Sequence, residues 1–294
     1  MSSFIDTPLG YKIHYKLSGN PSGQLVILTH GLGGSTATFD SFVPLLPERF
    51  HAVSVDFPGF GKSPRPSAAD ARRISIADHV ANLHHLVASL QAAAPAGSAG
   101  ARMPVLLVGH SLGAVINLHA AAAAAASSPV GGLFLLGPGR AGGRIPAARA
   151  AMVDLAALVR TQGIAAAATK AAEVTNFYAD TPERTVPVAL RQTVYDAVAA
   201  SDPEAYAQTC EAMVADDHVD PAYGAITCPV VFVAGDKDMI SPVSRSEDLA
   251  KLVGGPVEVQ VVRSGHQLIL EDLEGVKLAL SIFLSRVEKA EPEA

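Results

Sequence analysis

The chain has 294 residues, of which 49% are hydrophobic and 17% charged, and its formal net charge is −6. A chain of this size can bury a substantial core, as one large domain or two modest ones. The mild acidity argues against a nucleic-acid partner, which would require a basic patch or stripe. Two cysteines are too few for a disulfide framework, and the first residues do not read as a signal peptide. No apolar segment is long enough to cross a bilayer, so we expect a soluble, cytoplasmic protein without a membrane partner.

The predicted strands begin with a hairpin, in which residues 4–7 and 11–17 flank the turn sequence Pro8-Leu9-Gly10. Short, almost continuous apolar runs follow, as is typical of parallel strands covered on both faces. They occupy residues 25–29, 52–55, 105–108, 133–136 and 230–234, and a valine-rich run follows at residues 257–262. Helical patterns, for example at residues 76–93 and 112–126, separate most of them. This alternation predicts an α/β fold with a doubly wound sheet.

Two segments depart from the alternation. Residues 94–101 are small and polar and predict a surface loop. Residues 139–225 are rich in alanine and helical in pattern, with candidate helices at residues 145–160, 164–176, 183–200 and 203–216. We interpret this second segment as a helical lid inserted into a core that comprises residues 1–138 and 226–294.

The sharpest motif is Gly109-His110-Ser111-Leu112-Gly113, which matches G-x-S-x-G. A predicted strand ends directly before it and a predicted helix follows. That context suits a tight turn which exposes the serine as a nucleophile, with glycines leaving room for neighbouring backbone. We therefore predict that Ser111 is catalytic.

A serine hydroxyl needs a base, and the base needs an acid to orient it. His266 follows the predicted strand at residues 257–262, and active groups gather where strands of such sheets end. Two aspartates, Asp236 and Asp238, follow another strand. We favour Asp238 and keep Asp236 as the reserve, and the order Ser111, Asp238, His266 is the order expected for this type of fold.

Charge that develops on a substrate oxygen must be met by N–H groups. The loop His30-Gly31-Leu32-Gly33-Gly34 follows a predicted strand and can fold over the nucleophile. We expect the backbone N–H groups of Leu32 and Leu112 to form an oxyanion hole.

Two other motifs fail on one residue each. A phosphate-binding loop ending at Lys62-Ser63 would need glycine where Asp56 stands, and a dinucleotide fingerprint starting at Gly31 would need glycine where Thr36 stands. No histidine–carboxylate cluster has metal-ligand spacing. We expect no cofactor and no metal.

Together these motifs resemble the α/β-hydrolase superfamily along almost the whole chain. The stretches that carry the resemblance are residues 30–34, 56–63, 109–113, 235–238 and 265–266. Within the superfamily, the chain resembles lidded esterases and 3-oxoadipate enol-lactonases. Epoxide hydrolases and haloalkane dehalogenases attack with an aspartate, and Ser111 at that position argues against both.

The resemblance implies a serine hydrolase that cleaves an ester or lactone of a small, largely apolar substrate through an acyl-enzyme. Two alternatives stay open: hydrolysis of a carbon–carbon bond in a β-diketone-like substrate, and a slow-turnover ligand receptor. The oligomeric state is also open. The candidate pocket residues are mostly aromatic and lie mainly in the predicted lid: Phe39, Phe177, Tyr178, Tyr195, Tyr206, Met213 and His218.

Overall fold

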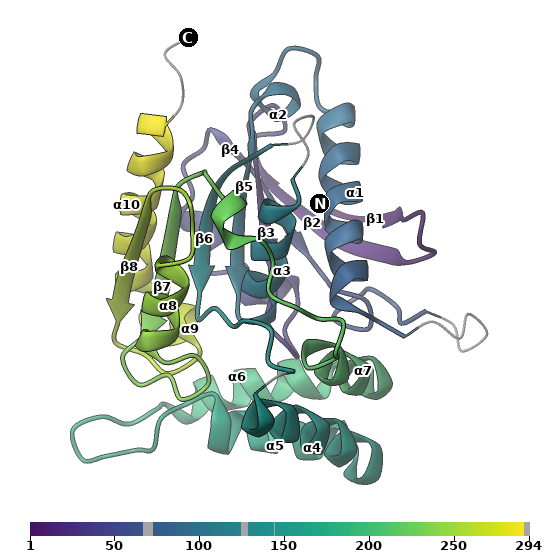
Figure 1. Ribbon diagram of the computed structural model, residues 1–294, viewed down its shortest axis with the longest axis vertical. Coiled ribbons are helices and arrows are strands. Elements are labelled where there is room, and N and C mark those ends of the chain that lie inside the picture. The colour runs from purple at the N-terminus through teal and green to yellow at the C-terminus, as the bar shows by residue number, and fades with distance from the viewer. Residues whose placement is uncertain (67–72, 125–128, 144, 291–294) are drawn as a thin grey trace.

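A computed structural model of the chain describes residues 1–66, 73–124, 129–143 and 145–290. Its centre is an eight-stranded sheet in the order β1-β2-β4-β3-β5-β6-β7-β8 (Figure 1). The pairs β1–β2 and β2–β4 are antiparallel, and all other neighbours are parallel. The strands are β1 (Ser2–Asp6), β2 (Lys12–Gly19), β3 (Gln24–Thr29), β4 (Phe50–Val55), β5 (Val105–His110), β6 (Val130–Leu136), β7 (Val230–Gly235) and β8 (Val257–Val262).

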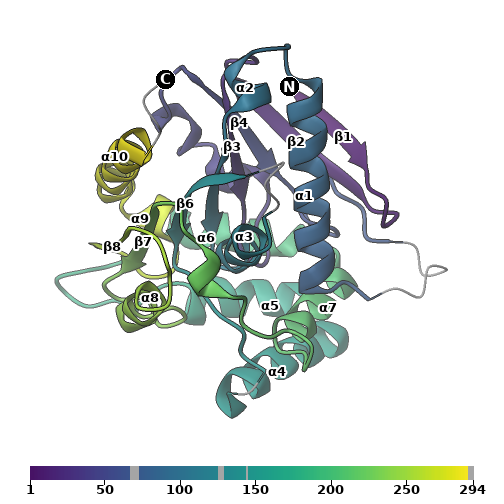
Figure 2. The ribbon, with the colours of Figure 1, turned by 45° about the horizontal axis from the view of Figure 1, so that its top comes forward.

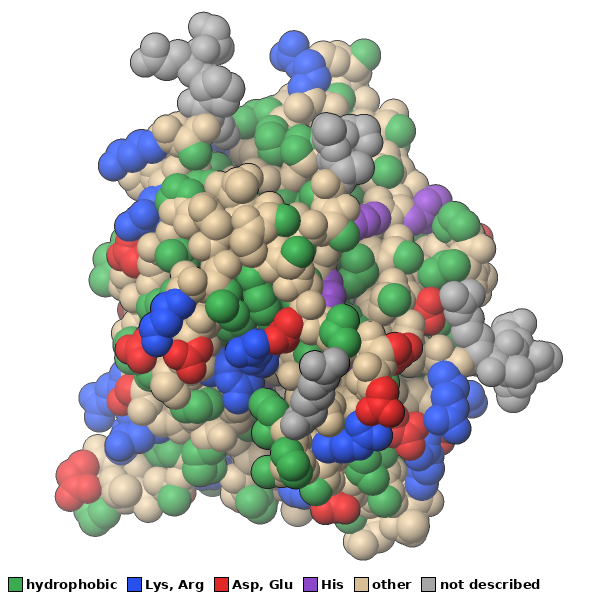
Figure 3. All heavy atoms as spheres, in the orientation of Figure 1, with side chains coloured by type: hydrophobic (Ala, Val, Ile, Leu, Met, Phe, Trp, Pro, Cys, Tyr) green, Lys and Arg blue, Asp and Glu red, His purple; other side chains and the backbone are tan. Residues whose placement is uncertain are grey.

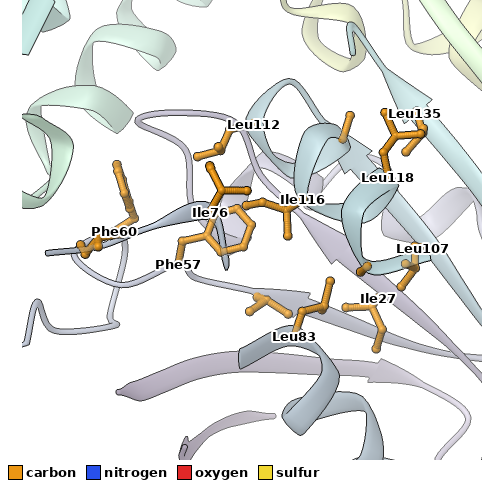
Figure 4. Close-up of a cluster of buried hydrophobic side chains, with 14 of the residues drawn as sticks. Ile27, Phe57, Phe60, Ile76, Leu83, Leu107, Leu112, Ile116, Leu118 and Leu135 are labelled. Carbon is orange, nitrogen blue, oxygen red and sulfur yellow. The ribbon is translucent and has the colours of Figure 1, made fainter. Parts of the chain in front are cut away.

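The central strands are apolar because both of their faces are covered. Every residue of β3, β5 and β7 is buried, and alternate side chains enter two separate hydrophobic layers. Helices α1 (Ile76–Ala93), α3 (Leu112–Ala122) and α8 (Val243–Ala250) cover one face, where Figure 4 shows Leu83 of α1 and Ile116 of α3 in one buried cluster with the strand residues Ile27, Leu107 and Leu135. Helix α10 (Leu273–Ala290) covers the other face, together with the short turns η1 (Thr36–Phe39) and η2 (Val43–Leu45) (Figure 2).

The segment between β6 and β7 is mainly helical, and we call residues 139–225 the insert. Figure 1 places its helices below one end of the sheet, the end at which the parallel strands finish. They are α4 (Pro146–Gln162), α5 (Ile164–Lys170), the π-helical turn η4 (Ala171–Thr175), α6 (Val188–Ala199) and α7 (Pro203–Met213), followed by the short turn η5 (Tyr223–Ala225). Figure 3 shows Lys and Arg side chains interspersed with Asp and Glu side chains over this region. Arg160 of α4 pairs with two glutamates of α7.

The start of α7 sits directly on the core. The N–H of Asp202 donates to the carbonyl of Gly59 at 2.9 Å. Gly59 has a φ of +83°, and a Cβ built there would lie 2.0 Å from the Cβ of Ala205. A side chain at position 59 would therefore be strained and would collide with α7.

The predicted α/β architecture, a mostly parallel sheet flanked by helices, is confirmed, and several predicted boundaries need correction. The predicted loop at residues 94–101 contains the start of a short helix, α2 (Ala99–Arg102). The predicted helix at residues 164–176 changes from α to π geometry after Lys170, and α6 begins five residues later than residue 183. Helix α3 ends at Ala122, and the end of its predicted range lies outside the described residues. Among the described helices, none is both long and apolar enough to cross a membrane.

Candidate active site

The turn between β5 and α3 holds Ser111 in a strained backbone conformation. Its φ is 51° and its ψ is −111°, and no other non-glycine residue in the described ranges has a positive φ. The Ser111 N–H donates to the carbonyl of Leu136 on β6 at 2.9 Å, which fixes the turn. Gly113 is required because a Cβ there would lie 2.1 Å from the carbonyl oxygen of Thr29. Strain of this kind is a feature of functional sites and presents the hydroxyl at the end of the sheet.

The three residues predicted as a triad meet at this turn. The Nε2 of His266 lies 2.8 Å from the Oγ of Ser111, and its Nδ1 lies 2.7 Å from the Oδ2 of Asp238. His266 and Asp238 are buried, and Ser111 is partly exposed. A continuous hydrogen-bonded chain thus runs from a hydroxyl through an imidazole to a carboxylate, which is the arrangement that activates a serine.

The choice between the two aspartates is clear from their contacts. The Oδ1 of Asp238 accepts the N–H groups of Ile240 and Ser241, each at 2.8 Å, so that Oδ2 faces His266. Burial opposes ionisation of Asp238, yet the charge and hydrogen bond of His266 and these two N–H groups keep its pKa below its ordinary value. Asp236 instead forms an ion pair with Arg184 of the insert at 2.8 Å.

His110, the residue before the nucleophile, supports the loop of His266. Its Nε2 donates to the carbonyl of His266 at 2.8 Å. Burial, and then the nearby imidazole of His266, lower the pKa of His110 to about 3. A neutral His110 is therefore a fixed donor across the pH range in which a serine hydrolase works.

The predicted oxyanion loop, residues 30–34 after β3, lies against Ser111. A Cβ built on Gly31 would be 3.1 Å from the Cβ of Ser111, so this loop approaches Ser111 with its backbone. Leu112 is the first residue of α3, where helical N–H groups have no partner within the helix. Leu32 and Leu112 therefore belong to the two segments next to Ser111, and their role as an oxyanion hole stays a prediction.

The Asp56 carboxylate binds backbone N–H groups just after this loop and in the turn around Lys62. Its buried carboxylate accepts the N–H groups of Thr36 at 2.5 Å and Lys62 at 2.9 Å, and it lies 2.7 Å from the Nδ1 of His14. The segment around Lys62 thus braces the oxyanion loop through backbone donors and is not a phosphate loop.

Residues 26–276 match the Alpha/beta hydrolase family, which is most of the chain. The chain belongs to that family. Among curated relatives, "Probable oxidoreductase EphD" of Mycobacterium tuberculosis is 44% identical over 71 residues, which is 24% of this chain but only 12% of that protein. The "Magnesium-chelatase 30 kDa subunit" of Rhodobacter capsulatus is 28% identical, over 88% of this chain and 89% of that protein.

Solved structures agree with the family on the fold of this α/β-hydrolase. A thermophilic esterase from Thermogutta terrifontis superposes with a TM-score of 0.79 at 22% identity, covering 98% of this chain and 99% of that one. The enol-lactonase from Burkholderia xenovorans LB400 superposes with a TM-score of 0.78 at 20% identity, covering 96% and 100%. At these identities the likeness concerns the fold.

A cavity of about 340 Å³ lies next to the triad of this hydrolase: its described lining includes His110 and Gln267, which precede Ser111 and follow His266 in the chain, but none of the three triad residues. Its wall combines the oxyanion loop, the inner side of α6 and the segment after His266. Among the lining residues are Leu32, His110, Asn176, Val194, Val198 and Gln267. Most of this wall is apolar, but it is built from glycines and aliphatic side chains of three separate segments, so it gives little signal in the sequence.

None of the seven side chains named from the sequence as pocket candidates lines this cavity, and several have other partners. Phe39 is in the hydrophobic layer under α10, against Phe42, and Phe177 is buried beside the guanidinium of Arg191. Tyr178 stacks on Arg184, and His218 lies 3.2 Å from the ring of His119. The remaining three pack in the larger core layer or against it: Tyr195, Tyr206 and Met213. Tyr206 lies close to the oxyanion loop, because a Cβ built on Gly33 would be 3.2 Å from its ring.

Sequence reasoning missed three polar residues that hold the loop of His266: Asn176, Gln267 and Glu271. Glu271 accepts the N–H groups of Gly265 at 2.9 Å and Gln267 at 3.2 Å, and burial raises its pKa. No motif includes these residues, and their role depends on contacts between segments far apart in the chain. In the described ranges, no group of three or more histidine, cysteine or acidic side chains is placed to hold a metal ion.

Proposed function

We propose that this α/β-hydrolase is a serine hydrolase that cleaves a carboxylic ester or lactone of a small, largely apolar substrate. The observation that carries the proposal is the hydrogen-bonded chain Ser111–His266–Asp238, with distances of 2.8 and 2.7 Å. The strained turn at Ser111 and the adjoining cavity of about 340 Å³ support it. We also propose that the insert serves as the lid that bounds the substrate site.

In the proposed reaction, the Nε2 of His266 takes the proton from Ser111 as the serine oxygen attacks the carbonyl carbon. Asp238 keeps the other imidazole proton on Nδ1 and stabilises the imidazolium. The N–H groups of Leu32 and Leu112 bind the oxygen that becomes negative. The imidazolium then protonates the leaving alkoxide, the acyl-enzyme forms, and a water activated by His266 releases the acid.

The cavity composition favours uncharged acyl or alcohol groups. Val194, Val198, Leu268 and Ile269 supply apolar surface, and among the described lining residues Asp196 is the one acidic side chain and there is no lysine or arginine. Pockets of this kind bind apolar groups and orient them with a few polar contacts.

The test is intact mass after treatment with a fluorophosphonate, with wild type beside Ser111→Ala. We expect one adduct on wild type and none on the variant. Hydrolysis of short esters or lactones should fall by about 10³-fold or more in the variant. A variant that hydrolyses near the wild-type rate would refute the assignment of Ser111.

The alternatives are separated by the products. Cleavage of β-diketones without ester hydrolysis would indicate the carbon–carbon reaction. A wild-type protein that is labelled once and turns over no ester would favour the receptor.

A further inference from the structure

The loop that carries His266 is fixed by three successive backbone N–H groups. Those of Gly265 and Gln267 donate to Glu271, which lies in the core. The N–H of His266 itself donates to the carbonyl of Asn176 at 2.8 Å. Asn176 belongs to the insert, so the backbone of the proposed base depends on a contact that the core alone does not provide.

The side chain of Asn176 makes the same connection a second time. Its Oδ1 accepts from the Nε2 of Gln267 at 2.8 Å, and its Nδ2 donates to the carbonyl of Ala171 at 3.2 Å. Ala171 is the first residue of the π-helical turn η4, and the Asn176 N–H also donates to its carbonyl, at 3.0 Å. The Asn176 amide therefore ties the end of η4 to the residue that follows His266.

The π-helical turn explains how Asn176 reaches this loop. The i→i+5 bond from the Asn176 N–H to the Ala171 carbonyl spans one residue more than an α-helical bond and so shifts the end of η4 relative to a continuous α-helix, and such turns occur frequently at functional sites. The position is confined, because a Cβ on Gly265 would lie 2.9 Å from the Asn176 carbonyl oxygen. The loop and the turn thus meet with little free space.

From these contacts we infer that Asn176 is a positioning residue for His266, acting with Gln267 across the contact between insert and core. The inference rests on the proposed function, because it assigns a role in keeping the imidazole between Ser111 and Asp238. Asn176 and Gln267 also line the cavity, so a role in substrate binding alone must be distinguished from positioning.

The two roles predict different kinetics. Misplacement of the base slows every proton transfer and lowers kcat, whereas a change in the cavity wall alone raises KM. Glu271, His110 and the backbone carbonyl of residue 176 still hold the loop when the Asn176 side chain is changed, so the loss is partial. We expect kcat to fall about tenfold, within the range that small displacements of catalytic groups produce.

The decisive variants are Asn176→Leu, which keeps the branched shape and the backbone bonds of Asn176 but has no side-chain hydrogen bonds, and Asn176→Asp, which keeps an oxygen that accepts from Gln267. Arg160→Ala is the matched control, because it breaks the ion pairs between α4 and α7 and does not touch the His266 loop. Each protein is assayed for kcat and KM with one neutral ester, and for its rate of labelling by diisopropyl fluorophosphate. That reagent is small, so the labelling rate reports serine activation with little dependence on the cavity wall.

We expect Asn176→Leu to lose about tenfold in kcat and in labelling rate, Asn176→Asp to stay within about threefold of wild type, and Arg160→Ala to match wild type. A rise in KM with an unchanged labelling rate in Asn176→Leu would overturn the inference, as would equal losses in Asn176→Leu and Arg160→Ala. If Asn176→Leu does not fold, Gln267→Leu breaks the same bond from the core side and decides the matter on the same criteria. Failure of wild type to label at Ser111 would instead remove the proposed function itself.

Discussion

Replacing Asp238 by asparagine should inactivate the hydrolase without disturbing its structure. The Oδ1 of Asp238 accepts two backbone N–H groups at 2.8 Å, and its Oδ2 faces the Nδ1 of His266 at 2.7 Å. An asparagine must place its oxygen toward the two N–H groups, since the reverse orientation would set NH2 against two donors. The reverse orientation loses two hydrogen bonds at about 1–3 kcal/mol each, so it is disfavoured by about 2–6 kcal/mol.

The consequence for His266 is a change of tautomer. The asparagine NH2 would donate to Nδ1, so the imidazole proton would move to Nε2, facing Ser111. A protonated Nε2 cannot accept the serine proton. The same substitution in a serine protease triad lowers kcat about 10⁴-fold, which corresponds to about 5.5 kcal/mol in the activation barrier.

The assay is kcat for a short ester in Asp238→Asn, with Asp236→Asn as the matched control. The control removes only the ion pair with Arg184, so its kcat should stay near that of wild type and its stability should change by about 1 kcal/mol or less. Equal thermal midpoints would show that both variants fold. A loss of less than about tenfold in Asp238→Asn, or an equal loss in both variants, would refute the assigned orientation.

Two further predictions concern stability. His110 stays neutral in the fold and titrates near 6.5 when unfolded, so the unfolded chain binds the extra proton as the pH falls, and stability is lost from about pH 6.5 downward. Between pH 7 and pH 5 this lowers the free energy of unfolding by about 2 kcal/mol. His110→Gln keeps a donor for His266 and should reduce the pH dependence by that amount in urea titrations; an unchanged dependence would contradict the assignment. Gly33→Ala should cost more stability than Gly10→Ala, because both glycines have φ near +80° but only at Gly33 would a Cβ meet Val198, at 2.6 Å. Overpacking adds about 1–3 kcal/mol, so equal thermal midpoints would show that this contact relaxes freely.

The sequence predicts most of the fold and the residues of the triad because both follow from local patterns. Buried parallel strands are continuous apolar runs, and Ser111, Asp238 and His266 each follow the end of one strand. The order of those strands in space brings the three together. The choice of Asp238 over Asp236 rested on turn geometry, and the structure gives the physical reason, since Arg184 pairs with Asp236.

The cavity could not be predicted in the same way. Phe39 follows the oxyanion loop closely in sequence, yet it points into the layer under α10, because the short turn η1 directs it to the other face of the sheet. Asn176 carries no signal in the sequence, since its importance comes from a π-helical turn and from a partner 91 positions away. Contacts between distant segments decide both cases.

The close contact between the start of α7 and Gly59 limits which inserts from related proteins could replace the insert of this enzyme. Ala205 occupies the space in which a side chain at position 59 would lie, and Asp202 is bonded to the Gly59 carbonyl. A chimera that receives a foreign insert must therefore bring a small residue at the third position of α7, together with an N–H that reaches this carbonyl. The core turn and the first turn of the helix form one transferable unit, and a crossover placed between them would yield a mismatched protein even if both parents fold well.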